Sequence, residues 1–260
     1  MNFMKTLSIF IIFLFSALVI QAKTLRVAAY NVEFGKGGSA EEFGNMLKEY
    51  KLDIVTFNEA PGEDWTKKVG EACGMKFHYV GKTSSANHKD KYKSILSKTP
   101  LTDTSEVLLE GSGWSPASAV RASTVIDKVS YTIYSLHIPG SSGDKKNGAK
   151  SGTKAHSLTK ILSKDKSPNI IAMGDYNSRV EQNPIKAILR KGFKYTWEDL
   201  KTDLKKEKTW NVYNNKGEGV IDHILYKLKD KKVKVTDGGI IKLEKPLSDH
   251  APVWAEFSFE

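Results

Sequence analysis

Apolar residues recur along the chain with two different spacings, one typical of strands and one typical of helices. From 129 to 137, apolar or small residues stand at every second position, as expected for a strand. From 40 to 50, apolar residues recur at intervals of three and four, which predicts an amphipathic helix. Ser39 and Glu42 form a capping-box pattern at its start. The predicted strands are 25–31, 52–58, 76–81, 93–97, 118–126, 129–137, 169–175, 219–227, 232–236 and 253–259. The predicted helices are 40–50, 63–73, 153–163 and 183–191.

The order of these elements predicts one α/β domain with mixed sheet content. Helices and strands alternate in the first half, and paired strands dominate later. A length of 260 residues suits one large domain or two small ones. Because no repeat, linker or long low-complexity tract divides the sequence, we expect a single domain over 23–260 with a substantial core.

The first 22 residues have the pattern of a secretory signal. Lys5 supplies a positive charge, Thr6 to Ile20 form an apolar run, and a small residue precedes the predicted cleavage site at Ala22/Lys23. An uncleaved N-terminal anchor is the alternative interpretation. Either interpretation places the domain outside the cytoplasm, as a secreted or periplasmic protein.

Composition narrows the function classes. Hydrophobic residues make up 40% and charged residues 27% of the chain, which excludes a mainly disordered chain and a polytopic membrane protein. The net charge of +10 favours a polyanionic partner. The single cysteine excludes an intramolecular disulfide and a four-cysteine zinc site. No feature indicates a protein partner, so we expect a monomer.

Residues that can bind a metal ion or a phosphate stand at the ends of the predicted strands. These residues are Asn31, Glu59, His137, Asp175 with Asn177, and Asp222, followed by Asp249 with His250 before the last strand. Each one, taken singly, also has a structural interpretation as a turn, a loop cap or a core histidine. Carboxylates that converge at buried strand ends repel one another unless a cation lies between them. Oxygen ligands without a thiolate favour Mg²⁺, or alternatively Mn²⁺ or Ca²⁺, over zinc.

The order of these motifs resembles the endonuclease/exonuclease/phosphatase superfamily, which includes deoxyribonuclease I. The motifs are Tyr30-Asn31, Asn58-Glu59, Leu136-His137, Gly174-Asp175-Tyr176-Asn177, Ile221-Asp222 and Ser248-Asp249-His250. Asn58 stands where the family usually has Gln, and Tyr176 where it usually has Phe, and neither changes a ligand atom. The resemblance implies a four-layer sandwich of two mainly antiparallel sheets flanked by helices, with a site at one edge.

The resemblance also implies the roles of the strand-end residues. Glu59, helped by Asn31, holds the metal ion, and Asp249 is a second acidic group near it. Asp175 orients and deprotonates the attacking water, and Asn177 donates a hydrogen bond to the phosphoryl oxygen. His250, oriented by Asp222, contacts the phosphate. His137 protonates the leaving oxygen or binds the phosphate.

The expected substrate is nucleic acid, cleaved by metal-assisted attack of water. The residues proposed to contact substrate are Asp90, Arg121, Lys145 and Lys146, with Asp90 expected to pair with His137. The alternative is a sphingomyelinase-like or inositol-phosphate phosphodiesterase that acts on phospholipid headgroups or inositol phosphates. Trp114 is then the candidate for contact with a membrane. A third hypothesis, a catalytically silent binding module, fits poorly with so complete a set of acids, amides and histidines.

Overall fold

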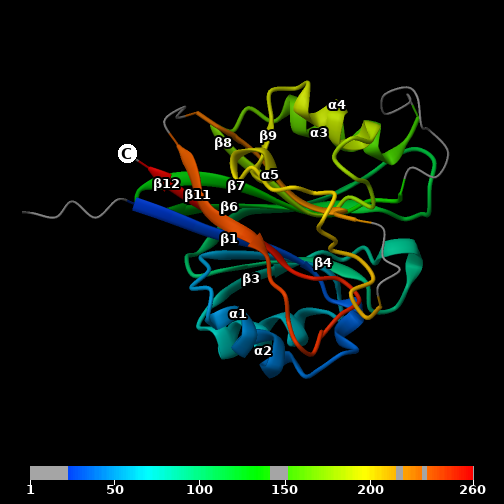
Figure 1. The fold of residues 1–260 in the computed structure, drawn as a ribbon. Coiled ribbons are helices and arrows are strands. Elements are labelled where there is room, and N and C mark those ends of the chain that lie inside the picture. Colours follow the sequence, from blue (N-terminus) through cyan, green and yellow to red (C-terminus); the bar gives the residue numbers. More distant parts are fainter. Residues whose placement is uncertain (1–22, 141–151, 215–218, 230–232, 260) are drawn as a thin grey trace, which may run out of the picture.

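Two six-stranded β-sheets stack face to face, and helices cover the outer face of each sheet (Figure 1). The computed structural model describes residues 23–140, 152–214, 219–229 and 233–259. Among the described residues the strands form ten pairings, of which eight are antiparallel. The two parallel pairs, β1–β2 and β7–β8, are the exceptions that shape the site. The predicted four-layer sandwich is confirmed. None of the helices in these ranges is long and apolar enough to span a bilayer.

The first sheet has the strand order β11-β12-β1-β2-β4-β3. Its strands are β1 (Lys23–Asn31), β2 (Ile54–Ala60), β3 (Phe77–Val80), β4 (Tyr92–Ser97), β11 (Lys234–Ile240) and β12 (Val253–Phe259). The helices α1 (Ala40–Lys48) and α2 (Glu63–Cys73) pack on its outer face (Figure 1). The predicted capping box forms at α1, where Ser39 Oγ accepts the Glu42 N–H and Glu42 Oε2 accepts the Ser39 N–H. Two short 3₁₀ helices, η1 (Glu33–Gly35) and η2 (Ser85–Asn87), lie in connecting loops.

The second sheet has the strand order β5-β6-β7-β8-β10-β9. Its strands are β5 (Leu101–Leu108), β6 (Ser118–Ile126), β7 (Val129–His137), β8 (Asn169–Asp175), β9 (Lys194–Tyr195) and β10 (Asp222–Leu228). The helices α3 (Lys154–Lys164) and α4 (Asn183–Leu189) cover its outer face (Figure 1), and the short α5 (Thr196–Asp199) follows β9.

Three apolar clusters hold the four layers together. The central one lies between the sheets and includes Val27, Ile54, Ile133, Ile171 and Phe257, all fully buried. The other two fill the spaces between each sheet and its helices. Since each sheet is covered on both faces, its central strands are apolar on both sides, and the polar residues collect at the strand ends.

The sequence missed β5, β9 and α5. Most of β5 is exposed or half-buried at a sheet edge, so it lacks the apolar alternation that marks the other strands. The strand expected at 232–236 is β11, which extends to Ile240 through Gly238 and Gly239. The predicted signal segment 1–22 lies outside the described residues and remains a prediction.

Candidate active site

The strand topology brings the polar strand ends to one edge of the sandwich. β1 and β2 are parallel, so Asn31 lies beside Asn58 at their shared end. The parallel pair β7 and β8 places His137 opposite Asp175. Because β10 is antiparallel to β8, its first residue, Asp222, also lies opposite Asp175. Residues far apart in the sequence therefore meet at one place.

Hydrogen bonds join the two sheets at this edge. Asn58 Oδ1 on the first sheet accepts the backbone N–H of Asp175 on the second at 2.8 Å. Asn31 Nδ2 donates to Asp175 Oδ2 at 3.1 Å. Gly174 permits this approach: a Cβ there would lie 2.1 Å from the Leu136 carbonyl oxygen and 2.8 Å from Asn58 Oδ1. Its φ of +143° is also unfavourable for other residues.

A β-bulge directs Glu59 into the site. The pairing of β2 with β4 shifts register between Phe57 and Ala60. Within this bulge Glu59 has a left-handed φ of +53°, uncommon for a residue other than glycine. Glu59 Oε2 lies 2.8 Å from Lys91 Nζ, and Oε1 lies 3.8 Å from His137 Nε2. The carboxylate is thus almost buried and faces positively charged or polar groups.

Asp175 is buried and its carboxylate is held in a fixed orientation. Oδ1 accepts the Asn177 N–H at 2.7 Å, and Oδ2 accepts from Asn31 and from Asn177 Nδ2. Burial raises the pKa of Asp175 to about 7, against the lowering effect of His250. A carboxyl with a pKa near neutrality is suited to accept a proton from water. Asn177 Nδ2 also donates to the Ile138 carbonyl, so in this structure the amide orients Asp175.

His250, in the loop before β12, and Asp222, at the start of β10, form a buried pair. His250 Nδ1 lies 2.9 Å from Asp222 Oδ2, and His250 Nε2 lies 3.8 Å from Asp175 Oδ2. Although burial opposes the charged imidazole, Asp222 and then Asp175 raise the pKa of His250 to about 10. The imidazolium presents its Nε2–H to the pocket, where an anionic oxygen of a substrate would accept it.

A second histidine, His137, also lies near the Asp175 carboxylate. Its Nε2 is 3.5 Å from Asp175 Oδ2, and the Trp114 ring packs against it with 4.9 Å between ring centroids. Burial and the positive charges of Lys93, His250 and Lys91 hold the pKa of His137 well below 6.5. The neutral ring is better suited to bind a phosphate than to donate a proton to a leaving group. Its Nδ1 is buried without a hydrogen-bond partner among the described residues.

These groups line a pocket of about 400 Å³. Its wall includes Phe34, Trp114 and Trp210, so aromatic rings surround the polar centre. Asp249 lies at the rim, where Trp210 Nε1 donates to its Oδ2 at 3.3 Å and burial raises its pKa. The complete lining is Glu33, Phe34, Glu59, Ser85, Ala86, Lys91, Trp114, His137, Asp175, Asn177, Trp210, Asp249 and His250.

The structure brings together most of the predicted site residues. Asn31, Glu59, His137, Asp175, Asn177, Asp222, Asp249 and His250 all contact one another or line the pocket. Asp90 does not pair with His137: the Nδ1 of that ring has no hydrogen-bond partner among the described residues, and its Nε2 faces Glu59 and Asp175. Lys145 and Lys146 lie outside the described residues.

Arg121 occupies a structural position away from the pocket. Its Nε lies 3.2 Å from Asp165 Oδ2, and its other nitrogens donate to the Asp103 carbonyl and to Ser167 Oγ. Tyr134 OH donates to the same Asp165 oxygen. Since the arginine is committed to this cluster on the helix side of the second sheet, the structure gives no support to its predicted contact with substrate.

Two lysines near the site were missed by the sequence analysis. Lys91 directly follows Asp90, the residue expected to pair with His137. Lys93 is fully buried, and its ammonium donates to the Thr83 carbonyl at 2.8 Å and to Ser85 Oγ at 3.4 Å. Those bonds anchor the loop that places Ser85 in the pocket wall. A lysine within a predicted buried strand was the available signal for Lys93.

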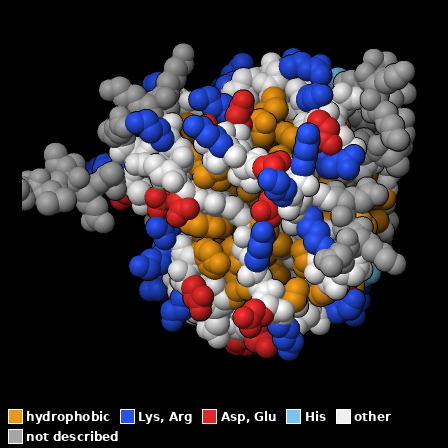
Figure 2. Space-filling model, in the orientation of Figure 1, with side chains coloured by type: hydrophobic (Ala, Val, Ile, Leu, Met, Phe, Trp, Pro, Cys, Tyr) orange, Lys and Arg blue, Asp and Glu red, His pale blue; other side chains and the backbone are white. Residues whose placement is uncertain are grey.

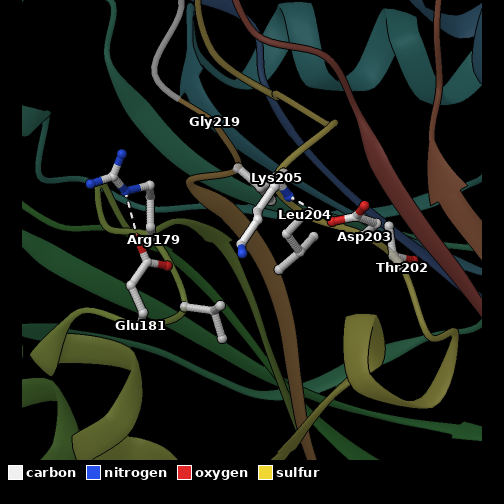
Figure 3. Close-up of a pocket in the computed structure, with 9 residues that line it drawn as sticks. Arg179, Glu181, Thr202, Asp203, Leu204, Lys205 and Gly219 are labelled. Carbon is white, nitrogen blue, oxygen red and sulfur yellow. Dashed lines mark hydrogen bonds and ion pairs between the residues drawn. The ribbon is translucent and has the colours of Figure 1, made fainter.

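A second, larger cavity has a volume of about 730 Å³ (Figure 3). Arg179 and Lys205 line it together with Glu181 and Asp203. Arg179 forms an ion pair with Glu181 at 2.8 Å, seen as a dashed line in Figure 3. The two acidic residues balance the charge of the two basic ones, and none of these four side chains is buried. This cavity therefore lacks the buried ionisable groups that mark the smaller pocket as the candidate catalytic site.

The donor set of the smaller pocket fits a hard divalent cation. Glu59, Asp175, Asp249 and Asn31 supply oxygen atoms, which Mg²⁺, Mn²⁺ and Ca²⁺ prefer. Ligand atoms of Asp175, Asp222 and His250 also lie within 4.8 Å of one another. Asp222 Oδ1 is buried without a hydrogen-bond partner among the described residues, and an anionic oxygen in that state favours a nearby positive charge.

Comparisons with known proteins agree with this geometry. Residues 28–250 match the endonuclease/exonuclease/phosphatase family. No curated protein matches the sequence. A solved endonuclease/exonuclease/phosphatase from Beutenbergia cavernae superposes with a TM-score of 0.70 at 15% identity, covering 90% of this chain and 71% of that one.

Two other solved structures carry more specific names. A mannosyl-6-phosphatase from Bacteroides thetaiotaomicron has a TM-score of 0.66 at 20% identity, with 90% of this chain and 100% of that chain covered. D. rerio TDP2, complexed with a single-strand DNA product, has a TM-score of 0.65 at 13% identity, with coverage of 90% and 98%. At these identities the likeness shows a shared fold.

Proposed function

The chain belongs to the endonuclease/exonuclease/phosphatase family, and from this premise we propose that it is a divalent-metal-dependent phosphodiesterase that cleaves nucleic acid. One observation supports the proposal above the others. The buried acid Asp175 lies between two histidines, His137 at 3.5 Å and His250 at 3.8 Å, in a pocket that Glu59 also lines. The pocket thus combines a general base (Asp175), a positively charged hydrogen-bond donor (His250) and a metal ligand (Glu59), and these three groups together can promote hydrolysis of a phosphate ester.

The proposed mechanism assigns the attack of water to Asp175. Its carboxylate, fixed by Asn31 and Asn177, orients a water molecule and takes its proton. His250, charged through its contact with Asp222, donates Nε2–H to a non-bridging phosphoryl oxygen. His137 binds a second oxygen of the phosphate. As the water oxygen bonds to phosphorus, the bond to the leaving oxygen breaks, and the leaving oxygen takes a proton from solvent.

Glu59, with Asn31 and Asp249, would hold the divalent cation. When bound, the cation neutralises the charge that develops on the phosphoryl group. Because uncatalysed phosphodiester cleavage is very slow, the site must lower the barrier by on the order of 15–20 kcal/mol. General acid–base groups contribute about 10²–10⁴-fold each, so electrostatic stabilisation by the histidines and the metal must supply much of the remainder.

The choice of nucleic acid as substrate rests on charge and on the pocket wall. The chain has a net charge of +10, and Figure 2 shows Lys and Arg side chains spread over the face in view, with acids among them. Lysines that contact phosphates give sequence-independent, salt-sensitive binding. Trp114, the residue considered for contact with a membrane, packs against His137 inside the pocket. We also propose that residues 1–22 direct export of the protein.

Hydrolysis assays with purified protein test the proposal. Nicking of supercoiled plasmid and cleavage of single-stranded DNA and RNA are compared in Mg²⁺ and in EDTA. Sphingomyelin vesicles, an inositol phosphate and a sugar phosphate serve as competing substrates. We expect metal-dependent cleavage of nucleic acid that weakens between low and physiological salt.

A matched pair of variants controls for contaminating nucleases. Asp175→Asn should reduce cleavage by at least about 100-fold, since it removes the proposed base. Asp203→Asn makes the same chemical change in the larger cavity and should leave cleavage unchanged. Equal activity of Asp175→Asn and the unaltered protein, or exclusive turnover of a competing substrate, would contradict the proposed function.

A further inference from the structure

A lysine ammonium lies inside the proposed catalytic pocket, against the carboxylate that is expected to hold the metal. Lys91 Nζ is 2.8 Å from Glu59 Oε2, and the two side chains are 24% and 11% exposed. Lys91 Nζ also lies 5.3 Å from the centre of the Phe34 ring. Lys91, Glu59 and Phe34 all line the pocket. The ammonium is therefore held between a nearly buried carboxylate and an aromatic face.

This contact places two positive charges in competition for one carboxylate. A divalent cation bound to the Glu59 carboxylate would repel the ammonium that lies 2.8 Å from Oε2 of the same group, and the repulsion is weakly screened because the site is largely buried. Lysine has a flexible four-carbon stem, and the partial exposure of Lys91 leaves its head room to move. The backbone of the segment can stay in place, since the Ser85 N–H donates to the Lys91 carbonyl.

We propose that Lys91 is an internal counter-ion of Glu59 that a divalent cation displaces, and that the displaced ammonium then binds the phosphate of the substrate. The proposal rests on the proposed function, because it takes Glu59 as a metal ligand and a phosphate ester as substrate. Phe34 favours an ammonium at the pocket wall through a cation–π contact, so the displaced head stays near the reaction centre. Lys91 thereby lowers the affinity for metal alone and raises the affinity for metal and phosphate together.

Metal binding measured without turnover tests the first half of this proposal. Mn²⁺ is titrated into the metal-free full-length protein by calorimetry, and the Mn²⁺ spectrum is followed by electron paramagnetic resonance. Lys91→Met should bind Mn²⁺ about tenfold more tightly, which corresponds to roughly 1.4 kcal/mol. Lys89→Met removes an exposed lysine two residues away and should bind like the unaltered protein. In a Glu59→Gln background the Lys91→Met substitution should no longer change Mn²⁺ affinity.

Inorganic phosphate is the probe for the second half. Saturating Mn²⁺ should increase the phosphate affinity of the unaltered protein. The ratio of the phosphate affinities with and without Mn²⁺ should be at least about fivefold smaller in Lys91→Met. Lys91→Arg should retain most of the coupling because it keeps the charge.

The outcomes separate the two proposals. Equal Mn²⁺ affinity in Lys91→Met and the unaltered protein, or phosphate coupling that survives in Lys91→Met, would overturn the role of Lys91 while leaving the phosphodiesterase proposal standing. Absence of Mn²⁺ binding in the unaltered protein would count against the metal-dependent function itself, and with it against the displacement of Lys91. Correct folding of each variant is verified by circular dichroism in EDTA.

Discussion

Replacing Asp222 by Asn tests the electrostatic core of the site. The substitution keeps the shape of the side chain and removes its charge. In the structure Asp222 Oδ2 lies 2.9 Å from His250 Nδ1, and the two side chains are only 1% and 5% exposed. Asp222 is the strongest of the neighbours that raise the pKa of His250.

The magnitude follows from that pKa. A rise from 6.5 to about 10 corresponds to roughly 5 kcal/mol of favourable interaction with the charged imidazole, at about 1.4 kcal/mol for each pKa unit. Because the pKa is raised on folding, this stabilisation is fully present below pH 6.5 and is lost as the pH rises through 10. Asp222 supplies the largest favourable share of this interaction. In Asp222→Asn, the change in the free energy of unfolding between pH 6.5 and pH 10 should therefore be smaller by on the order of 3 kcal/mol.

Two measurements on the metal-free protein check this expectation. Urea unfolding between pH 5 and 10 should give curves for the two proteins that differ most below pH 6.5 and converge toward pH 10. The ring protons of His250, followed by NMR, should titrate near pH 10 in the unaltered protein and at least one unit lower in Asp222→Asn. His223 is an internal reference, because burial lowers its pKa to about 4.

Parallel unfolding curves, or a His250 ring that titrates near pH 6.5 in the unaltered protein, would refute this reasoning. Cleavage by Asp222→Asn should also fall by about 10²–10⁴-fold at neutral pH, since His250 would no longer present a charged donor. Normal cleavage by a variant with a lowered His250 pKa would show that the charge is not needed for turnover.

Four further predictions concern stability and metal dependence. Gly174→Ala should lower the free energy of unfolding by about 2–4 kcal/mol, because the new Cβ would lie 2.1 Å from a backbone oxygen of β7; urea denaturation measures this, and unchanged stability would contradict it. Burial favours the protonated form of Asp165, but hydrogen bonds, led by the one from Ser167, lower its pKa to about 2. Asp165→Asn should therefore have a lower free energy of unfolding than the unaltered protein above about pH 4. The difference should vanish as the pH falls toward 2. Arg121→Met should likewise reduce thermal stability and leave cleavage unchanged, whereas reduced cleavage at full stability would restore the predicted contact with substrate. Removal of divalent ions with EDTA should abolish cleavage without loss of circular dichroism signal, and activity should return with Mg²⁺ or Mn²⁺; full cleavage in EDTA would exclude metal dependence.

The sequence predicted the strand-end residues because their positions depend on patterns that are local. Glu59 and Asp175 each follow an apolar run, and the ends of such strands meet when neighbouring strands are parallel. The bulge that turns Glu59 inward could not be predicted, since it depends on the register between β2 and β4. The same is true of the bond from the Asp175 backbone to Asn58, which joins two sheets.

The structure does not support the expected contacts of Asp90 and Arg121, because the sequence does not reveal the direction in which a side chain points. Asp90 and Lys91 are neighbours, and only the loop geometry decides that the lysine reaches Glu59. Arg121 lies within a strand whose two faces meet different layers, and Asp165 attracts it to the helix side. The exposed edge strand β5 was missed because its stability comes from pairing with β6 rather than from an apolar face.

Because the site is divided between two sheets, catalysis depends on how those sheets are aligned. Asn31 and Glu59 belong to the first sheet, whereas Asp175 and Asp222 belong to the second. A shear of about 1 Å between the layers can reduce turnover by 100-fold, although it leaves each sheet intact. Heating or mild denaturant should therefore abolish activity before the sheets unfold. Core substitutions distant from the pocket should likewise reduce activity before they measurably change the secondary structure.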